Sequence, residues 1–389
     1  MVGAVLTAAD FDYELPPELI AEQPPAIRDQ ARLLVLGDAE PAHHRFAELP
    51  ALLSQRVGEG SLLVLNDTKV LPARLRGHKL HEGEAGGRLE LLLLSPAPDA
   101  GRQVDRQLWR VMYRTSKPLR PGGRIRLVAA DGSAPCEATV LECTAGGEAL
   151  IDFGELDGAA FDALLQRVGE IPLPPYIEKA RERSGHCRDT EEDRRRYQTV
   201  FARASGSVAA PTAGLHFTPE LLAALRLAGH EIATVTLHVG PGTFLPLRTD
   251  SIAEHAMHAE RYHIPTETSA AIGAAREAGR PVVAVGTTVV RTLEAATAQG
   301  EPAPSSGWGE TQIFIHPPYR FKAVDAMLTN FHLPRSTLLM LVAAFAGRRR
   351  ILAAYAAAIA AGYRFYSFGD AMLIPRPLAE SENELKDVA

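Results

Sequence analysis

The strongest constraint on the fold is a change in sequence pattern near Phe153. From about Leu75 to Phe153 the chain carries short runs of alternating apolar and polar residues, separated by Gly, Pro and Ser clusters. This pattern is typical of antiparallel strands in a barrel or a sandwich. After Phe153, apolar strand-like runs alternate with helix-like segments, which indicates βαβ units and a parallel sheet.

The segment before the alternating runs belongs with the later part of the chain. Residues 61–65 (SLLVL) read as a buried strand, and the last strand is expected at residues 363–368 (YRFYSF). We therefore predict an α/β fold with a mixed, largely parallel sheet flanked by helices and an inserted antiparallel β-barrel domain. The predicted catalytic domain is discontinuous, comprising residues 1–74 and 155–389, and the barrel comprises residues 75–154.

Charge is unevenly distributed over these predicted parts. The whole chain has a formal net charge of −6, yet eight basic residues and only one acid, Asp105, lie between Arg102 and Arg126. Alternation along a strand places Arg110 and Arg114 on one face and Trp109, Val111 and Tyr113 on the other. The basic face is either an ordinary solvated surface or a surface for phosphate groups.

Cysteine usage and hydropathy suggest a cytoplasmic protein outside the membrane. Cys136, Cys143 and Cys187 are far apart and form no C-x-x-C pair, which disfavours a disulfide framework, a zinc ribbon or an iron–sulfur cluster. The beginning of the chain has no basic region followed by an apolar stretch, so no signal peptide is predicted. The longest apolar runs, 338–346 and 351–361, are too short to span a bilayer.

Polar side chains follow several predicted strands at the point where each strand ends. No P-loop, nucleophile elbow or H-E-x-x-H motif is present, and the spacing in residues 254–260 (EHAMHAE) fits no standard metal-ligand set. Ligands bind at the carboxyl ends of the strands in open α/β sheets. If the strands are parallel, one pocket gathers Thr212, His216, His238, Thr243, Thr287, Thr288, Arg291, Glu294, Asn330, His332 and Asp370.

One stretch stands out among these strand ends, residues 208–217 (VAAPTAGLHF). It is too apolar for a surface linker and too rich in Pro, Thr and Gly for a helix. A single histidine in a turn more often hydrogen-bonds only the backbone, but three histidines at three strand ends favour a functional site. Glycines such as Gly214, Gly240 and Gly242 would let the backbone approach a ligand closely, and a threonine-capped helix could present N–H groups to a carboxylate.

Long ordered stretches of the chain resemble the S-adenosylmethionine:tRNA ribosyltransferase-isomerase family of queuosine biosynthesis. The resemblance runs through most of the sequence and rests on FDYELPPELIAEQP, RLLVL, LLVLNDTKVLPARL, IPLPPYI, RYQTVFA, SVAAPTAGLHF, VTLHVGPGTFLPLR, MHAERYHIP, VVAVGTTVVRTLE, TQIFIHPPYRFKAVDAMLTNFHLPRSTL and YRFYSFGDAMLI. Departures are few: Pro317-Pro318 stands where the family usually has Pro-Gly, and Ala259 where it commonly has Ser.

The resemblance implies a reaction in which S-adenosylmethionine donates ribose instead of a methyl group. The acceptor is 7-aminomethyl-7-deazaguanine at the wobble position of tRNA, the product is epoxyqueuosine, and adenine and methionine leave. The family is expected to act as a cytoplasmic monomer that uses S-adenosylmethionine as a co-substrate and needs no metal.

Such chemistry requires a base for the C5′–H beside the sulfonium, an acid for the departing adenine and a group that deprotonates the attacking amine. The candidates are His216, His238 and His332, with Asp370 and Glu294 as carboxylate partners, and which is acid and which is base stays open. Predicted substrate-binding residues are Thr212, Gly214, Gly240, Gly242, Thr243, Thr287, Thr288, Arg291 and Asn330. Predicted tRNA-binding residues are Arg110, Arg114, Lys117, Arg124 and Arg126.

Two other functions remain open at this point. An ordinary S-adenosylmethionine-dependent RNA methyltransferase would yield S-adenosylhomocysteine and no free adenine. A non-catalytic RNA-binding module would bind tRNA without consuming the donor, although the clustered polar strand ends disfavour it.

Overall fold

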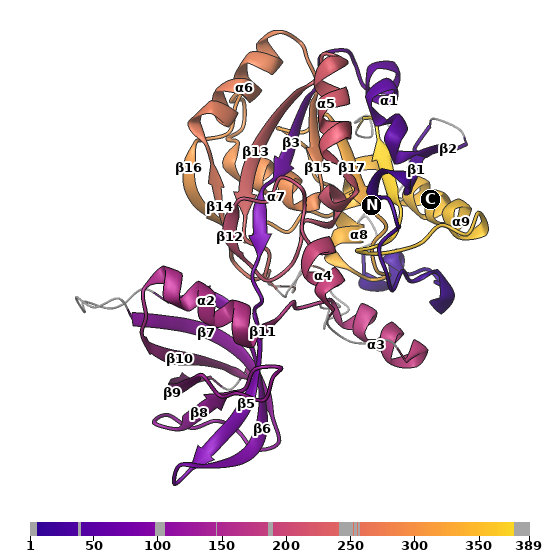
Figure 1. The fold of residues 1–389 in the computed structure, drawn as a ribbon. Helices are drawn as coiled ribbons and strands as arrows, with labels where there is room; N and C mark the ends of the chain where they lie inside the picture. Colours follow the sequence, from indigo (N-terminus) through magenta and orange to yellow (C-terminus); the bar gives the residue numbers. More distant parts are fainter. Residues whose placement is uncertain are drawn as a thin grey trace.

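A computed structural model describes residues 6–37, 40–97, 106–144, 146–185, 190–240, 252, 255 and 257–376. Two bodies are visible in Figure 1, a helix-flanked sheet and, below it, a β-barrel drawn in purple to magenta. The chain enters the barrel after β4 (Thr68–Val70) and returns through α3 (Pro175–Ser184) and α4 (Glu191–Arg196). Strand β4 pairs in parallel with β12 (Ala204–Ser207), so the outgoing and returning segments lie side by side.

The described residues of the first body form a nine-stranded mixed sheet. Its strand order is β16-β14-β13-β3-β15-β17-β18-β1-β2. The strands are β1 (Arg32–Val35), β2 (Ala42–Arg45), β3 (Leu62–Asn66), β13 (Glu231–Leu237), β14 (Glu260–Ile264), β15 (Val282–Val285), β16 (Gly307–Thr311), β17 (Ala326–Asn330) and β18 (Ala371–Ile374). The central strands β13, β3, β15 and β17 run parallel, whereas β18 is antiparallel to β17. The predicted mixed α/β sheet is confirmed.

Helices cover both faces of this sheet, which explains its continuously apolar strands. Leu62 and Val64 of β3 face one hydrophobic core, while Leu63 and Leu65 face the other. The first core includes side chains from α6 (Thr266–Glu277), α7 (Thr287–Ala296), α8 (Thr337–Ala346) and α9 (Arg348–Ala360), and the second includes side chains from α1 (Leu49–Arg56) and α5 (Pro219–Leu227).

The second body is a closed antiparallel barrel. Its sheet has the order β11-β5-β6-β7-β10-β9-β8, and an additional pairing of β5 with β8 closes the ring. The strands are β5 (Arg74–His81), β6 (Glu84–Pro96), β7 (Arg106–Thr115), β8 (Arg124–Leu127), β9 (Cys136–Cys143), β10 (Glu148–Glu155) and β11 (Gly169–Glu170). The predicted barrel is confirmed, and the alternative of a sandwich is excluded.

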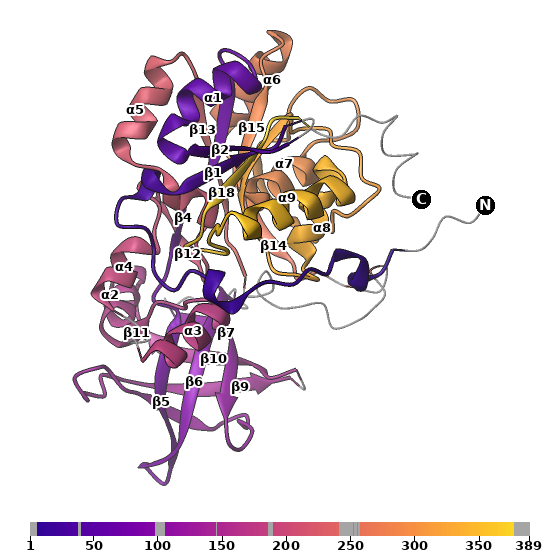
Figure 2. The same cartoon turned by 90° about the vertical axis from the view of Figure 1, so that its right-hand side faces the viewer.

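Helix α2 (Gly158–Val168) and β11 extend this body beyond Glu155. Phe161, Leu165 and Val168 of α2 belong to the hydrophobic core of the barrel, and β11 pairs with β5. Trp109 of β7 stacks on Phe161 with ring centroids 5.4 Å apart. The helix therefore covers the end of the barrel that faces the rest of the molecule (Figure 2).

The last strand differs from the sequence-based expectation. Residues 363–368 do not form a strand; Phe365 makes only an isolated parallel bridge to Ile20, and the strand that follows is β18. Tyr366 has a φ of 73°, a left-handed conformation that interrupts an extended chain. Because β18 is antiparallel to β17, its first residue lies at the same edge of the sheet as the last residue of β17.

Candidate active site

A pocket opens at the edge where the parallel strands end. It lies after β15 and β17, beside the 3-10 turn Thr212–His216 and the loop before β18. Its lining residues are Tyr176, Ala210, Pro211, Thr212, Ala213, Val239, Gly286, Thr287, Thr288, Thr329, Asn330, Phe331, His332, Leu333, Ser336, Leu338, Tyr366 and Ser367. The structure thus brings together five of the predicted residues: Thr212, Thr287, Thr288, Asn330 and His332.

The threonine pair belongs to the first turn of α7. Gly286 precedes this helix with a φ of 94°, a conformation that glycine adopts at little cost. Thr288 Oγ1 accepts a hydrogen bond of 3.4 Å from Asn66 Nδ2 at the end of β3. The positive end of the helix dipole and two threonine residues therefore border the pocket, an arrangement that suits a carboxylate.

Asn330, the last residue of β17, has an amide orientation set by its neighbours. Its Nδ2 lies 3.2 Å from His216 Nε2, 3.2 Å from the Tyr366 carbonyl oxygen and 3.4 Å from the Asp370 carbonyl oxygen. Three acceptors thus surround the nitrogen. Among the described residues, Oδ1 is buried without a hydrogen-bond partner. A bound molecule with an N–H or O–H group would satisfy this oxygen.

His216 lies behind the pocket wall. It is 2% exposed, its ring packs on Phe46 with centroids 4.9 Å apart, and it also hydrogen-bonds the backbone of Arg28. Burial lowers its pKa to about 4, so the ring is neutral near pH 7. The stretch VAAPTAGLHF is therefore a buried turn whose histidine holds Asn330 and is absent from the pocket lining.

His332 is the histidine that lines the pocket. Its Nε2 lies 2.8 Å from Thr329 Oγ1, and its backbone N–H donates to Tyr355 Oη at 2.9 Å. Tyr13 Oη donates to its carbonyl oxygen. Burial lowers the pKa of His332 to about 3, so the ring is an unprotonated base at neutral pH.

Aromatic side chains form a wall of the pocket that the sequence analysis missed. Tyr176 of α3 and Tyr366 lie with ring centroids 4.6 Å apart, and Phe331 also lines the pocket. Tyr176 Oη is hydrogen-bonded to Ser367 Oγ. The stretch IPLPPYI, which contains Tyr176, carried the family resemblance, but no periodicity in it indicated that its tyrosine reaches the strand ends.

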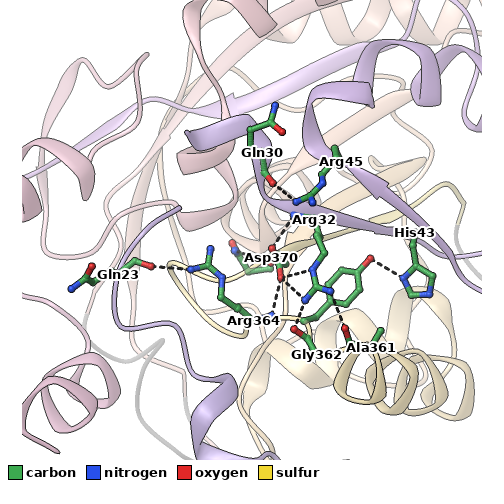
Figure 3. Close-up of polar contacts among 11 residues, drawn as sticks. Gln23, Gln30, Arg32, His43, Arg45, Ala361, Gly362, Arg364 and Asp370 are labelled. Carbon is green, nitrogen blue, oxygen red and sulfur yellow. Dashed lines mark hydrogen bonds and ion pairs between the residues drawn. The ribbon is translucent and has the colours of Figure 1, made fainter. Parts of the chain in front are cut away.

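Asp370 lies beside the pocket wall and holds two segments together (Figure 3). Its carboxylate accepts hydrogen bonds of 2.8 Å from the backbone N–H groups of Arg32 and Arg364. The Arg32 guanidinium forms an ion pair with it at 3.4 Å. Asp370 therefore contributes to the site through its carbonyl oxygen, which accepts from Asn330.

His238 follows β13 but does not line the pocket. Its Nδ1 is 2.9 Å from Thr68 Oγ1, and a Cβ on Gly206 would come within 2.8 Å of its ring. Burial and the nearby Arg261 lower its pKa. The next residue, Val239, lines the pocket instead, because neighbouring side chains of an extended chain point in opposite directions.

Glu294 and Arg291, both in α7, have partners away from the pocket. The Glu294 carboxylate accepts from the backbone N–H groups of Lys322 and Ala323, and burial raises its pKa. Arg291 forms a buried ion pair with Glu260. Glu260 in turn accepts a 3.1 Å hydrogen bond from the Gly240 N–H. No sequence pattern indicated a role for Glu260, because its partner lies 31 residues away along the chain.

The predicted glycines have different placements. A Cβ on Gly214 would lie 2.8 Å from Phe201 and from Thr199, so this glycine allows close packing inside the protein. Gly242 and Thr243 lie outside the described residues.

Some of the basic residues predicted on the face of the barrel form ion pairs with an acidic residue. Arg110 and Arg114 are exposed on β7 while Trp109 and Val111 are buried, as the alternation predicts. Lys117 is exposed in the following loop. Arg124 and Arg126 of β8 both form ion pairs with Glu137.

Neither a metal site nor a membrane span is found in the described part of the chain. No group of three or more His, Cys, Asp or Glu side chains among these residues is placed to hold a metal ion. None of the helices that they form is long and apolar enough to cross a membrane.

Known proteins resemble this chain over almost its whole length. Residues 8–374 match the profile of a family described as queuosine biosynthesis protein. S-adenosylmethionine:tRNA ribosyltransferase-isomerase of Anaeromyxobacter dehalogenans (strain 2CP-C) is 51% identical, covering 95% of this chain and 99% of that protein. The protein of the same name from Moorella thermoacetica is 50% identical, and the match covers 94% of this chain and 98% of that protein.

A solved structure of S-adenosylmethionine tRNA ribosyltransferase from Thermotoga maritima is 36% identical and covers 94% of this chain and 99% of that chain, with a TM-score of 0.49. The family match and the identity of the relatives establish the family. The chain belongs to the queuosine biosynthesis protein family.

Proposed function

We propose that this chain transfers the ribosyl group of S-adenosylmethionine to 7-aminomethyl-7-deazaguanine in tRNA and isomerises it to epoxyqueuosine, releasing adenine and methionine. The observation that carries the proposal is about 50% sequence identity, over almost the whole chain, to relatives named S-adenosylmethionine:tRNA ribosyltransferase-isomerase. The acceptor base, the product and the leaving groups are those that the family resemblance implies. The pocket supports it, because hydroxyl, amide and imidazole groups meet an aromatic wall in one place.

We assign the donor to the pocket by its chemistry. The start of α7, with Thr287 and Thr288, suits the methionine carboxylate. The aromatic wall of Tyr176, Phe331 and Tyr366 suits a purine or deazapurine ring. Asn330 Oδ1 accepts a hydrogen bond from an N–H or O–H group of the substrate.

We assign His332 as the base that acts on the substrate. The ring lines the pocket and is unprotonated at pH 7, and it can accept a proton from the C5′–H beside the sulfonium or from the attacking amine once the bound substrate raises its pKa of about 3 toward neutrality. The same property makes it a poor acid for the departing adenine. His216 acts through Asn330 as a positioning residue.

We also propose that the barrel is a separate domain that contacts tRNA, and that the chain is a cytoplasmic monomer that modifies the wobble position. Exposed Arg110 and Arg114 support the tRNA contact. Light scattering of the purified protein would test the monomer.

Product analysis by mass spectrometry tests the reaction. The protein is incubated with S-adenosylmethionine and tRNA that carries either guanine or 7-aminomethyl-7-deazaguanine at the wobble position. Adenine and methionine should appear only with the modified tRNA. S-adenosylhomocysteine would instead indicate a methyltransferase, and an unconsumed donor would indicate a binding protein.

A further inference from the structure

Five arginines gather beside the pocket wall and bind mostly backbone carbonyl groups. We name them the arginine cluster: Arg28, Arg32, Arg45, Arg196 and Arg364. Figure 3 shows Arg32, Arg45 and Arg364 around Asp370. The five come from the N-terminal segment, β1, β2, α4 and the loop before β18.

Most hydrogen bonds of the cluster go to neutral acceptors, which do not cancel its charge. Arg28 donates to the Leu215 carbonyl oxygen at 2.8 Å, and Arg45 donates to that of Gln30 at 2.8 Å. Arg364 donates to the Gln23 carbonyl oxygen at 3.3 Å. A neutral carbonyl satisfies an N–H group without neutralising the guanidinium, and each guanidinium has five N–H donors.

Three carboxylates also contact the cluster, and one of them, Asp370, lies among its arginines (Figure 3). Asp370 pairs with Arg32, Glu192 pairs with Arg196 at 3.8 Å, and Glu48 accepts from the backbone N–H of Arg45. Burial, and then repulsion from Arg196, lowers the pKa of Arg28 to about 10. An incoming anion would relieve this repulsion.

The cluster connects directly to the pocket. Arg28 binds the carbonyl oxygen of Leu215, in the turn whose first residue, Thr212, lines the pocket. The backbone of Arg28 also hydrogen-bonds His216, which holds Asn330. Arg364 lies two residues before Tyr366 of the aromatic wall.

We propose that the arginine cluster binds backbone phosphates of the tRNA next to the modified base, an inference that rests on the proposed function. Several arginines from separate segments of the chain provide a row of positive charges, which suits a chain of phosphates better than one small anion. The helix-flanked sheet, to which we assign catalysis and which we call the catalytic body, then contributes its own RNA surface in addition to the barrel.

Salt-dependent binding of an unmodified tRNA transcript tests the proposal. The double variant Arg45→Glu/Arg364→Glu should bind about tenfold or more weakly at low salt. The slope of log affinity against log salt should fall by about one for each phosphate that the variant no longer binds. The matched control is Arg226→Glu, an exposed arginine in α5, which should behave as the unchanged protein.

Conservative variants separate charge from structure. Arg45→Lys/Arg364→Lys should keep most of the affinity, because the positive charges remain. If the double glutamate variant fails to fold, Arg45→Glu alone carries the test, since the Arg45 side chain is exposed.

An unchanged affinity and salt slope in a folded glutamate variant would overturn the cluster as an RNA surface. That failure is distinct from failure of the proposed function. The unchanged protein would still release adenine with the modified tRNA in the first case, and would release none in the second.

Discussion

The barrel and the catalytic body both carry surface arginines, but the groups that accept hydrogen bonds from these arginines differ between the two regions. On the barrel, Arg124 and Arg126 share Glu137, and Arg76 pairs with Glu170. In the arginine cluster most partners are carbonyl oxygens. An excess of arginines along the sequence therefore identifies a basic region. Whether these arginines bond to carboxylates or to neutral carbonyl groups determines how much of their positive charge is available to a ligand.

The two bodies also differ in how they bury polar groups. The barrel core is almost entirely apolar and is formed mainly by strands that are neighbours in the sequence. The pocket wall instead buries neutral His216 and Asn330, which meet across 114 residues of chain. The catalytic body should therefore be the more sensitive of the two to removal of a single polar atom.

The largest effect is expected for Asn330→Ala. Removal of its Oδ1 should reduce turnover on the order of a hundredfold or more while tRNA affinity stays unchanged, because the side chain lines the pocket and not the outer surface. Adenine release measures turnover. Gln107→Ala, which removes a barrel side chain bonded to the Leu156 carbonyl oxygen, is the control and should keep full turnover.

Acid should weaken the catalytic body before the barrel. His216 and His332 have folded pKa values of about 4 and about 3, below the ordinary 6.5. Below pH 6.5 the unfolded chain binds protons that the folded chain does not, so stability is full above 6.5 and falls as the pH drops toward 4. Hydrogen exchange at pH 7 and pH 5 should show protection decreasing at β17 while β7 keeps it; a decrease at β7 first would contradict this.

A smaller effect is expected on the basic face of the barrel. Arg110→Glu/Arg114→Glu should raise the apparent KM for tRNA several-fold and leave donor binding unchanged. Steady-state kinetics with each substrate varied in turn measure both. If the KM for tRNA rises by the same factor as the affinity of Arg45→Glu/Arg364→Glu for tRNA falls, the two surfaces do not differ. An unchanged KM would exclude the barrel face from tRNA binding.

The smallest effect is expected for Glu137→Gln. This ion-pair network on the barrel surface should contribute less than about 1 kcal/mol to stability. The change also frees Arg124 and Arg126, so tRNA affinity should rise by about twofold at low salt. Urea unfolding and fluorescence anisotropy measure the two quantities. A weaker affinity for tRNA would show that the ion pairs with Glu137 do not keep Arg124 and Arg126 from binding tRNA.

The sequence by itself determined the two-part architecture and the family. Alternation placed Trp109 and Val111 on the same face of a barrel strand, and the apolar run at β3 predicted a buried strand, because side-chain period is a local property. Polar residues at strand ends also predicted Thr287, Thr288, Asn330 and His332 at the pocket edge.

Only the tertiary structure decided which polar residues lie together at the pocket and in its wall. It placed His216 behind Asn330, turned His238 toward Thr68, and brought Tyr176 from α3 to the strand ends. It also decided that the arginines of the cluster meet carbonyl groups and those of β8 meet Glu137. Such contacts join residues far apart in the chain, so their geometry depends on packing and leaves no periodic signal in the sequence.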